Sequence, residues 1–190
     1  MPLPAWTEDA AHFPDPEHRI WLRRRLSMFG SPLVFILYNP SRAGHERDDA
    51  TARRGIGFAN AVGASDLVFV NAFTGIATDA DDLAGMADPV GAMADEALEA
   101  AAEFCLRRRG TMVAAWGAPK GRATTRRLAE ERFGHILSLG LPLHVLRMTA
   151  SGYPEHPLRL PADLRPVPWP GPRVAAPQRL PAAASPPSPC

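Results

Sequence analysis

Two asparagines that follow short apolar segments carry the side chains best suited to chemistry in this chain. Asn39 comes directly after residues 33–38 (LVFILY), and Asn71 comes directly after residues 67–70 (LVFV). An asparagine amide offers both an acceptor and donors, so it can recognise the edge of a nucleobase or position a water molecule. An asparagine before a proline is also a common turn former, and both interpretations of Asn39 stay open.

A histidine in a later loop is the second candidate for chemistry. His156 stands between Glu155 and Pro157, after the apolar segment 143–146. It could donate a hydrogen bond to a developing anion or transfer a proton, although surface histidines without a role are common. Trp116-Gly117 closes another apolar segment, residues 111–115, and Trp116 could stack on a base or fill the core.

The loop between the first apolar segment and the next helix holds further polar groups. A set of four side chains there could bind a divalent metal or, for the acids, cap the helix: His45, Glu46, Asp48 and Asp49. The cap is the simpler interpretation, so we predict neither a metal nor a cofactor. Ser41 lacks the Gly-x-Ser-x-Gly frame of an activated nucleophile, and the chain has no phosphate-binding glycine motif.

These side chains need elements to position them, and the pattern of the chain predicts an α/β fold. The apolar segments 33–38, 67–70, 111–115 and 143–146 are expected to be buried strands, with helices at residues 50–62, 88–109 and 119–133 between them. Alternation of this kind predicts a three-layer α/β/α domain with a central, mainly parallel, four-stranded sheet. The polar groups would then meet at the carboxyl edge of the sheet, where open α/β sheets bind ligands.

The remaining segments define the borders of the domain. We expect residues 1–18 to be a loosely packed lead-in, residues 19–169 to form a single domain and the Pro/Ala-rich residues 170–190 to be disordered. Residues 19–26 could form a helical turn or an edge strand; because Gly30-Ser31-Pro32 signals a turn, we favour a strand that pairs as a hairpin with residues 33–38. The arginines at 23–25 fit a solvated strand edge better than a phosphate site. The acids at 79, 81 and 82 are expected in a solvated loop.

Composition narrows the classes of function. The chain has 190 residues, 46% of them hydrophobic, and a net charge of +1, which does not indicate a broadly basic surface for nucleic acid. Its two cysteines give no disulfide framework, and no apolar run reaches the length of a membrane span. We therefore expect a cytoplasmic monomer that does not bind membranes.

Several motifs in the same order resemble the bacterial and phage family called domain of unknown function 1643 (DUF1643). They are LVFILYNPSRAG, DDATARRGIGFA, VFVNAF, VAAWG and EHPLRLPADLRPVPW, and together they span about residues 19–169. The family name brings no established activity. One departure from the family pattern is Ala50, where a proline would be expected after the paired acids.

A more distant resemblance, to uracil-DNA glycosylases and their mismatch-specific relatives, implies an activity. Asn39-Pro40, Asn71, Trp116-Gly117 and His156-Pro157 resemble motifs that these α/β/α enzymes carry at strand ends. The resemblance implies that Asn39 positions the attacking water, that Asn71 reads the base and that His156 stabilises the departing base anion. It departs from the most active enzymes in lacking their water-activating aspartate.

That resemblance also implies the residues that would surround the substrate and its chemical class. The substrate-binding set is Pro40, Ser41, Asn71, Phe73, Trp116, Gly117 and Pro157. The partner would be a nucleobase, a nucleotide or DNA, and the reaction would be hydrolysis of an N-glycosidic bond. Two alternatives remain: a module that binds a nucleotide or modified base without chemistry, and a metal-dependent hydrolase that uses the acidic loop.

Overall fold

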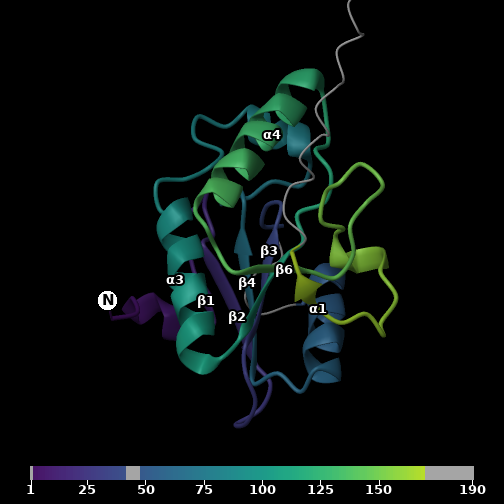
Figure 1. Cartoon of the computed structure of the whole chain (residues 1–190). Coiled ribbons are helices and arrows are strands. Elements are labelled where there is room, and N and C mark those ends of the chain that lie inside the picture. Colours follow the sequence, from purple (N-terminus) through teal and green to yellow (C-terminus); the bar gives the residue numbers. More distant parts are fainter. Residues whose placement is uncertain (1, 42–47, 170–190) are drawn as a thin grey trace, which may run out of the picture.

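The computed structural model describes residues 2–41 and 48–169, which form one β-sheet with α-helices and short 3₁₀ turns around it (Figure 1). The strands are β1 (Ala11–His12), β2 (Trp21–Arg25), β3 (Leu33–Leu37), β4 (Asp66–Asn71), β5 (Thr111–Ala114), β6 (Leu143–Val145) and β7 (Val167–Pro168). The helices are α1 (Ala50–Ala61), α2 (Ala80–Ala84), α3 (Ala94–Arg108) and α4 (Ala123–Ser138), and the 3₁₀ turns are η1 (Ala5–Glu8) and η2 (Pro157–Arg159).

The strands form a single sheet in the order β1-β2-β4-β3-β5-β6-β7. The four strands expected from the apolar segments are its centre, and they run parallel to one another. The expected total of four was wrong, because antiparallel strands extend both edges. Two of these additions, β1 and β7, have only two residues each, which is too short to leave an alternating pattern in the sequence.

The expected hairpin between β2 and β3 is also corrected. Strand β2 pairs antiparallel with β4, with Leu22 opposite Phe69, while β3 lies between β4 and β5. The connection from β2 to β3 instead crosses the start of β4. There the backbone carbonyl of Ser65 accepts a hydrogen bond from Leu26, and the N–H of Ser65 donates one to the carbonyl of Ser31. Gly30 permits this crossing: its φ is +104°, and a Cβ there would lie 2.2 Å from the carbonyl oxygen of Gly63.

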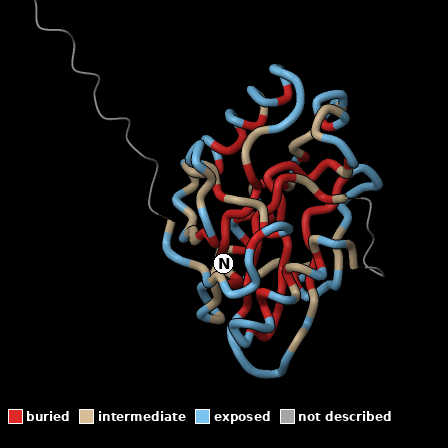
Figure 2. The backbone as a smooth tube through the Cα atoms, turned by 90° about the vertical axis from the view of Figure 1, so that its right-hand side faces the viewer, coloured by how far each residue is buried: buried red, intermediate tan, exposed pale blue. Residues whose placement is uncertain are grey.

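Helices cover both faces of the sheet, and the strand residues alternate between two cores. On one face, α3 and α4 pack against a core that includes Ile36, Val70 and Trp116. On the other face, α1 packs against a core that includes Phe35 and Phe69. Figure 2 shows the buried residues concentrated along the central strands, with exposed residues in the loops and outer turns. β3 and β4 are buried along their whole lengths, as expected of central parallel strands.

The start of α3 and the structure of the acidic segment after β4 differ from the expectation for physical reasons. α3 begins at Ala94 and not at Asp88-Pro89, because the carbonyl groups of Pro89 and Val90 accept hydrogen bonds from the chain that follows β4. The acidic segment expected to be a solvated loop contains α2, which Asp79 caps. Asp81 accepts a hydrogen bond from the backbone N–H of Arg122 at 2.8 Å. The acids of this segment therefore satisfy backbone N–H groups at the starts of α2 and α4.

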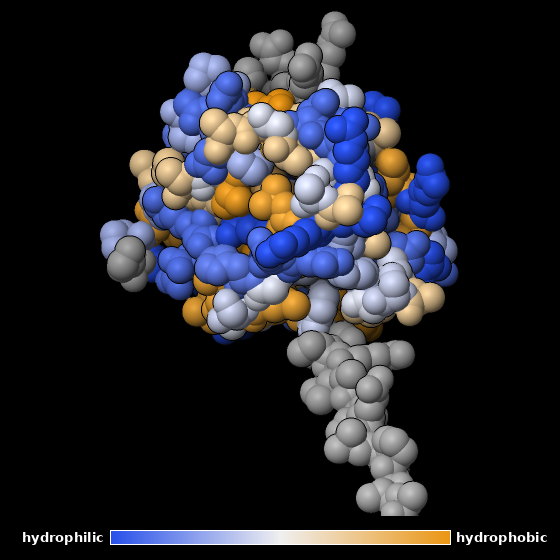
Figure 3. All heavy atoms as spheres, turned by 90° about the horizontal axis from the view of Figure 1, so that it is seen from above, coloured by the Kyte–Doolittle hydropathy of each residue, from blue (hydrophilic) through white to orange (hydrophobic). Residues whose placement is uncertain are grey.

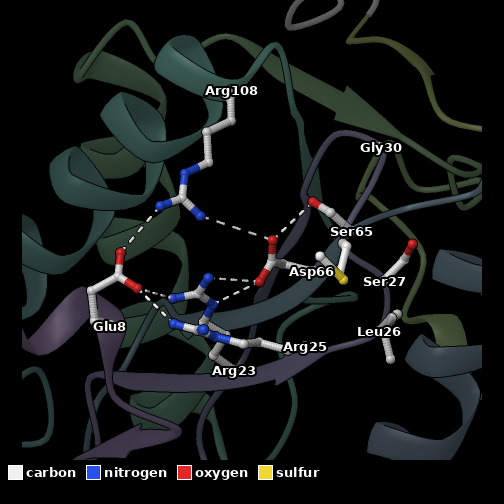
Figure 4. A pocket seen from close by; sticks show the side chains of 10 residues that line it. Glu8, Arg23, Arg25, Leu26, Ser27, Gly30, Ser65, Asp66 and Arg108 are labelled. Carbon is white, nitrogen blue, oxygen red and sulfur yellow. Dashed lines mark hydrogen bonds and ion pairs between the residues drawn. The ribbon is translucent and has the colours of Figure 1, made fainter.

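An ion-pair network holds the N-terminal turn against the opposite end of the sheet, where the parallel strands begin (Figure 4). Arg23 is 5% exposed and pairs with Asp66 at 2.7 Å and with Glu8 at 3.0 Å. Glu8 also pairs with Arg25 and Arg108. The hydrogen bond from Arg23 lowers the pKa of Glu8 most; burial opposes this effect, and the charges of Arg23, Arg108 and Arg25 add to it. These groups line an open hollow of about 810 Å³.

We expect Asp66→Ala to lower the free energy of unfolding by about 3–5 kcal/mol, because it leaves the buried guanidinium of Arg23 without its closest countercharge. The matched control is Glu103→Ala, which removes an exposed helical ion pair with Arg107 and should cost about 0.5 kcal/mol or less. Urea denaturation of the two variants measures the difference. Equal effects of the two substitutions would contradict the structural importance assigned to the buried pair.

Candidate functional site

A small cavity of about 60 Å³ opens where β3 and β4 end, on the face of the sheet that α1 covers. Its lining brings together four residues expected at the site, Asn39, Ser41, Asn71 and His156, with Arg19, Leu22, Leu37, Asp49, Thr51, Ala52 and Phe69. Figure 3 looks onto the end of the molecule at which the parallel strands finish, and there hydrophilic side chains surround a central group of hydrophobic ones. The cavity therefore occupies the edge that the α/β pattern predicts.

Asn71 lines this cavity with a side-chain amide that has unused hydrogen-bonding capacity at both its nitrogen and its oxygen. It is the last residue of β4, lies opposite Leu37 of β3 and is 2% exposed. Neither its amide nitrogen nor its amide oxygen has a hydrogen-bond partner among the described residues. A buried amide without partners costs stability, so a ligand or water is needed to satisfy both atoms.

Asn39 uses its amide differently. Its Nδ2 donates to the carbonyl of Pro40 at 3.0 Å and to the carbonyl of Ala77 at 2.8 Å. Both amide hydrogens are thereby used, and the side chain ties the end of β3 to the segment after β4. The carbonyl Oδ1 is the atom of Asn39 that remains for a ligand or a water molecule.

Asp49 contributes a carboxylate that the surrounding groups keep ionised. It caps α1 by accepting from the N–H of Ala52 at 2.7 Å, and it accepts from the hydroxyl of Ser41 at 2.6 Å. Burial opposes ionisation, but the hydrogen bonds from Ser41 and the backbone, together with the charge of Arg19, lower its pKa. Ser41 is thus oriented by Asp49 beside the cavity.

His156 is a neutral imidazole in this setting. Burial lowers its pKa to about 4, assisted by the charge of Lys120 and opposed by that of Asp49. Its Nδ1 accepts from the backbone N–H of Leu158 at 3.3 Å, so we assign the proton of the neutral ring to Nε2. His156 can therefore donate a hydrogen bond at neutral pH without carrying a charge.

Arg19 is the main residue at the cavity that sequence reasoning missed. It precedes β2, and its backbone N–H donates to the carbonyl of Thr74 beyond the end of β4. The side chain is 5% exposed, and burial lowers its pKa to about 10, which still leaves it charged at neutral pH. The expected hairpin with β3 hid this position, because only the pairing of β2 with β4 brings Arg19 beside Asn71. The sequence likewise identifies Phe69 and Leu22 only as strand residues and gives no sign that they line a cavity.

The other residues expected at the site lie around the cavity or away from it. Phe73 and Trp116 are each 1% exposed and pack in the core on the opposite sheet face, with Trp116 stacked on Phe133. Neither lines the cavity, and Phe69 is the aromatic residue that does. Three further members of the expected set, Pro40, Gly117 and Pro157, are buried in the segments that adjoin Asn39 and His156.

The acidic loop does not form a metal site among residues 2–41 and 48–169, where no group of three potential ligands gathers. Asp48 accepts from the guanidinium of Arg24 at 2.8 Å, and Asp49 caps α1, so both acids have other partners. The remaining members of the expected set, His45 and Glu46, lie outside the described residues. So does the segment 170–190, which we expected to be disordered.

A family model described as "Protein of unknown function (DUF1643)" matches residues 19–158, which include every polar residue of the cavity. Comparison with curated proteins and with solved structures finds no match. In the part of the chain that the structure describes, no helix has the length and apolarity needed to cross a bilayer.

The two strand-end asparagines should respond oppositely to the same substitution. Asn39→Leu should lower the free energy of unfolding by about 1–3 kcal/mol, because two backbone carbonyls lose their donor. Asn71→Leu should leave the stability of the unliganded protein unchanged or raise it, because the amide it removes has no partner in the part of the chain that the structure describes. Thermal and urea denaturation of the matched pair tests this contrast, and a larger loss for Asn71→Leu would contradict it.

The titration of His156 offers a second test. We expect its imidazole to titrate near pH 4, and we expect Lys120→Ala to raise that pKa, because the substitution removes a nearby positive charge. Two-dimensional NMR over a pH series measures both values, with His156→Gln assigning the resonance. A midpoint near the ordinary value of 6.5 would contradict the buried, neutral imidazole. Since folding depresses this pKa, the associated stability is present above the unfolded value and is lost as the pH falls towards 4.

Proposed function

Because the chain belongs to the DUF1643 family, whose function is unknown, we propose a function from the site itself: recognition of a nucleobase and hydrolysis of its N-glycosidic bond. The observation that carries the proposal is Asn71, a buried amide whose donor and acceptor have no partner among the described residues, at a cavity on the carboxyl edge of the sheet. Nucleobases present donors and acceptors side by side on one edge, which an asparagine amide matches with two hydrogen bonds.

The arrangement of the cavity supports a planar ligand. Asn71 and Phe69 belong to the same strand face, two residues apart, so the ring of Phe69 offers an apolar surface beside the polar amide. Helices on both faces of a central parallel sheet agree with the three-layer architecture that the resemblance to uracil-DNA glycosylases implies, and we include that architecture in the proposal.

The proposed reaction assigns a role to each polar group. A water molecule held by the Oδ1 of Asn39 and by Ser41 attacks the anomeric carbon as the carbon–nitrogen bond breaks, and the bonding electrons leave with the base. The Nε2–H of His156 donates to the resulting base anion. One proton of the water passes through the hydroxyl of Ser41 to the carboxylate of Asp49 and later protonates the released base, so the products are a base and a sugar hemiacetal.

Asp49 is a weak base, because its hydrogen bonds lower its pKa, and this bears on the mechanism. Glycosidic cleavage passes through an oxocarbenium-like centre, and a water molecule that bonds to such a centre becomes acidic enough for a weak base to accept its proton. The lowered pKa of Asp49 also favours a second candidate function, a sensor that binds the base through Asn71 without cleaving it.

A base-release assay separates these functions. Wild-type protein would be incubated with nucleosides, nucleotides and single- and double-stranded DNA carrying uracil, mismatches and modified thymines, and released bases would be quantified by mass spectrometry. We expect release that falls on the order of a hundredfold in Asn71→Leu and in His156→Phe, since each removes a donor to the base. The matched control is Asn60→Ala, at an exposed position of α1, which should retain full activity.

Each other outcome changes the conclusion. Binding of a base or nucleotide that depends on Asn71, without release, would favour the sensor. Release that persists in both Asn71→Leu and His156→Phe would place the chemistry elsewhere in the molecule. If the protein neither binds nor releases any base, the proposed function is wrong.

A further inference from the structure

A second hollow, of about 310 Å³, adjoins the cavity, and His156 lines both. The cavity of about 60 Å³ is small beside the pockets of about 300–1,000 Å³ that hold whole small-molecule ligands. It can receive one edge of a small ring and a water molecule, but it cannot enclose a whole nucleotide. Whatever is bonded to that ring must therefore extend into a neighbouring space, and the hollow on the other side of His156 is such a space.

The charged residues of this hollow favour an anion. Lys120 and Arg159 are both exposed and both line it, and neither forms an ion pair with any residue that the structure describes. The acid of the hollow, Glu155, is already neutralised, because Arg147 holds it in two hydrogen bonds of 2.7 and 2.9 Å. Two cations with free donors thus face a space that contains no uncompensated carboxylate among its described lining residues.

Gly117 provides a sharp backbone turn in the lining of the hollow, beside His156. Gly117 has φ of +77°, and its N–H donates to the carbonyl of Pro154 at 2.9 Å, which turns the chain sharply after β5. Glycine adopts this conformation without a steric cost, and an added Cβ would approach the Cβ of His156 to 3.7 Å. Thr149 adds a hydroxyl to the lining.

We propose that the hollow lined by Lys120 and Arg159 is a phosphate subsite, and that the ligand of this protein is therefore a nucleotide unit and not a free base or nucleoside. The proposal rests on the proposed function, because the cavity at Asn71 holds the base. His156 at the junction would face the glycosidic bond, with the base on one side and the sugar-phosphate on the other. The phosphate could belong to a free nucleotide or to a nucleic acid backbone, which the experiment distinguishes.

The experiment compares ligands with and without phosphate. Isothermal titration calorimetry at low salt would measure binding of each deoxynucleoside, its 5′- and 3′-monophosphates, a short single-stranded oligonucleotide and inorganic phosphate. We expect the preferred monophosphate to bind at least about tenfold more tightly than its nucleoside, as charge-assisted hydrogen bonds allow. Lys120→Ala and Arg159→Ala should each remove most of this preference while leaving nucleoside affinity unchanged. Tighter binding of the oligonucleotide than of the monomer would assign the phosphate to a nucleic acid.

The matched control is Arg127→Ala, which removes one positive charge from an exposed position of α4 outside the hollow. It should retain the full preference for the monophosphate. Equal affinities of nucleoside and monophosphate in the wild-type protein would overturn the phosphate subsite and leave the base site standing. So would a preference that Arg127→Ala weakens as much as Lys120→Ala does, because a general charge effect would then explain it.

The two proposals fail in distinguishable ways. Binding of inorganic phosphate that depends on Lys120 and Arg159, without any contribution from a base, would support the subsite and contradict the proposed function. Absence of binding by any of these ligands would overturn both. Circular dichroism of each variant checks that it is folded, and exposed positions such as these tolerate truncation to alanine.

Discussion

The parallel pairing of β3 with β4 is the constraint on which the rest of the structure depends. Both strands are buried along their whole lengths, so each must have a neighbour on either side and a packed helix layer on either face. Their register sets Leu37 opposite Asn71, and the chain therefore leaves both strands at one edge of the sheet. A slip of one residue would turn every side chain to the other face, which would exchange the two cores and move Asn71 away from the cavity.

Two residues of one type at the ends of these strands have different consequences for stability and function. The side-chain amide of Asn39 donates hydrogen bonds to the carbonyl groups of Pro40 and Ala77, so Asn39 stabilises the backbone around the cavity. Asn71 is more deeply buried and has no partner among the described residues. Burial of an unsatisfied amide is unfavourable to folding, so its presence in an otherwise well-packed strand is more easily explained by a ligand than by stability.

The central strands and the edge at which the cavity lies could be predicted from sequence, because apolar segments ending in polar groups carry that information locally. The neighbour of β2 could not, because the turn residues Gly30-Ser31-Pro32 show where the chain bends and not which strand it meets. Arg19 was missed for that reason. Trp116 illustrates the opposite difficulty: a strand-end aromatic looks the same in sequence whether it faces a ligand or, as here, packs against Phe133.

The state of His156 links the electrostatics of the site to its proposed chemistry. A charged imidazole would attract any anion, including the phosphate of a ligand, and would compete with Lys120 and Arg159 for it. Burial and the charge of Lys120 hold the ring neutral instead, so that its Nε2–H offers a directed hydrogen bond and no net charge. Such a donor acts most strongly on charge that develops during bond breaking, because a neutral group does little to stabilise a neutral base beforehand. Under the proposed function, the separation of a neutral donor from two adjacent cations is therefore what lets one site distinguish the leaving base from the anion attached to it.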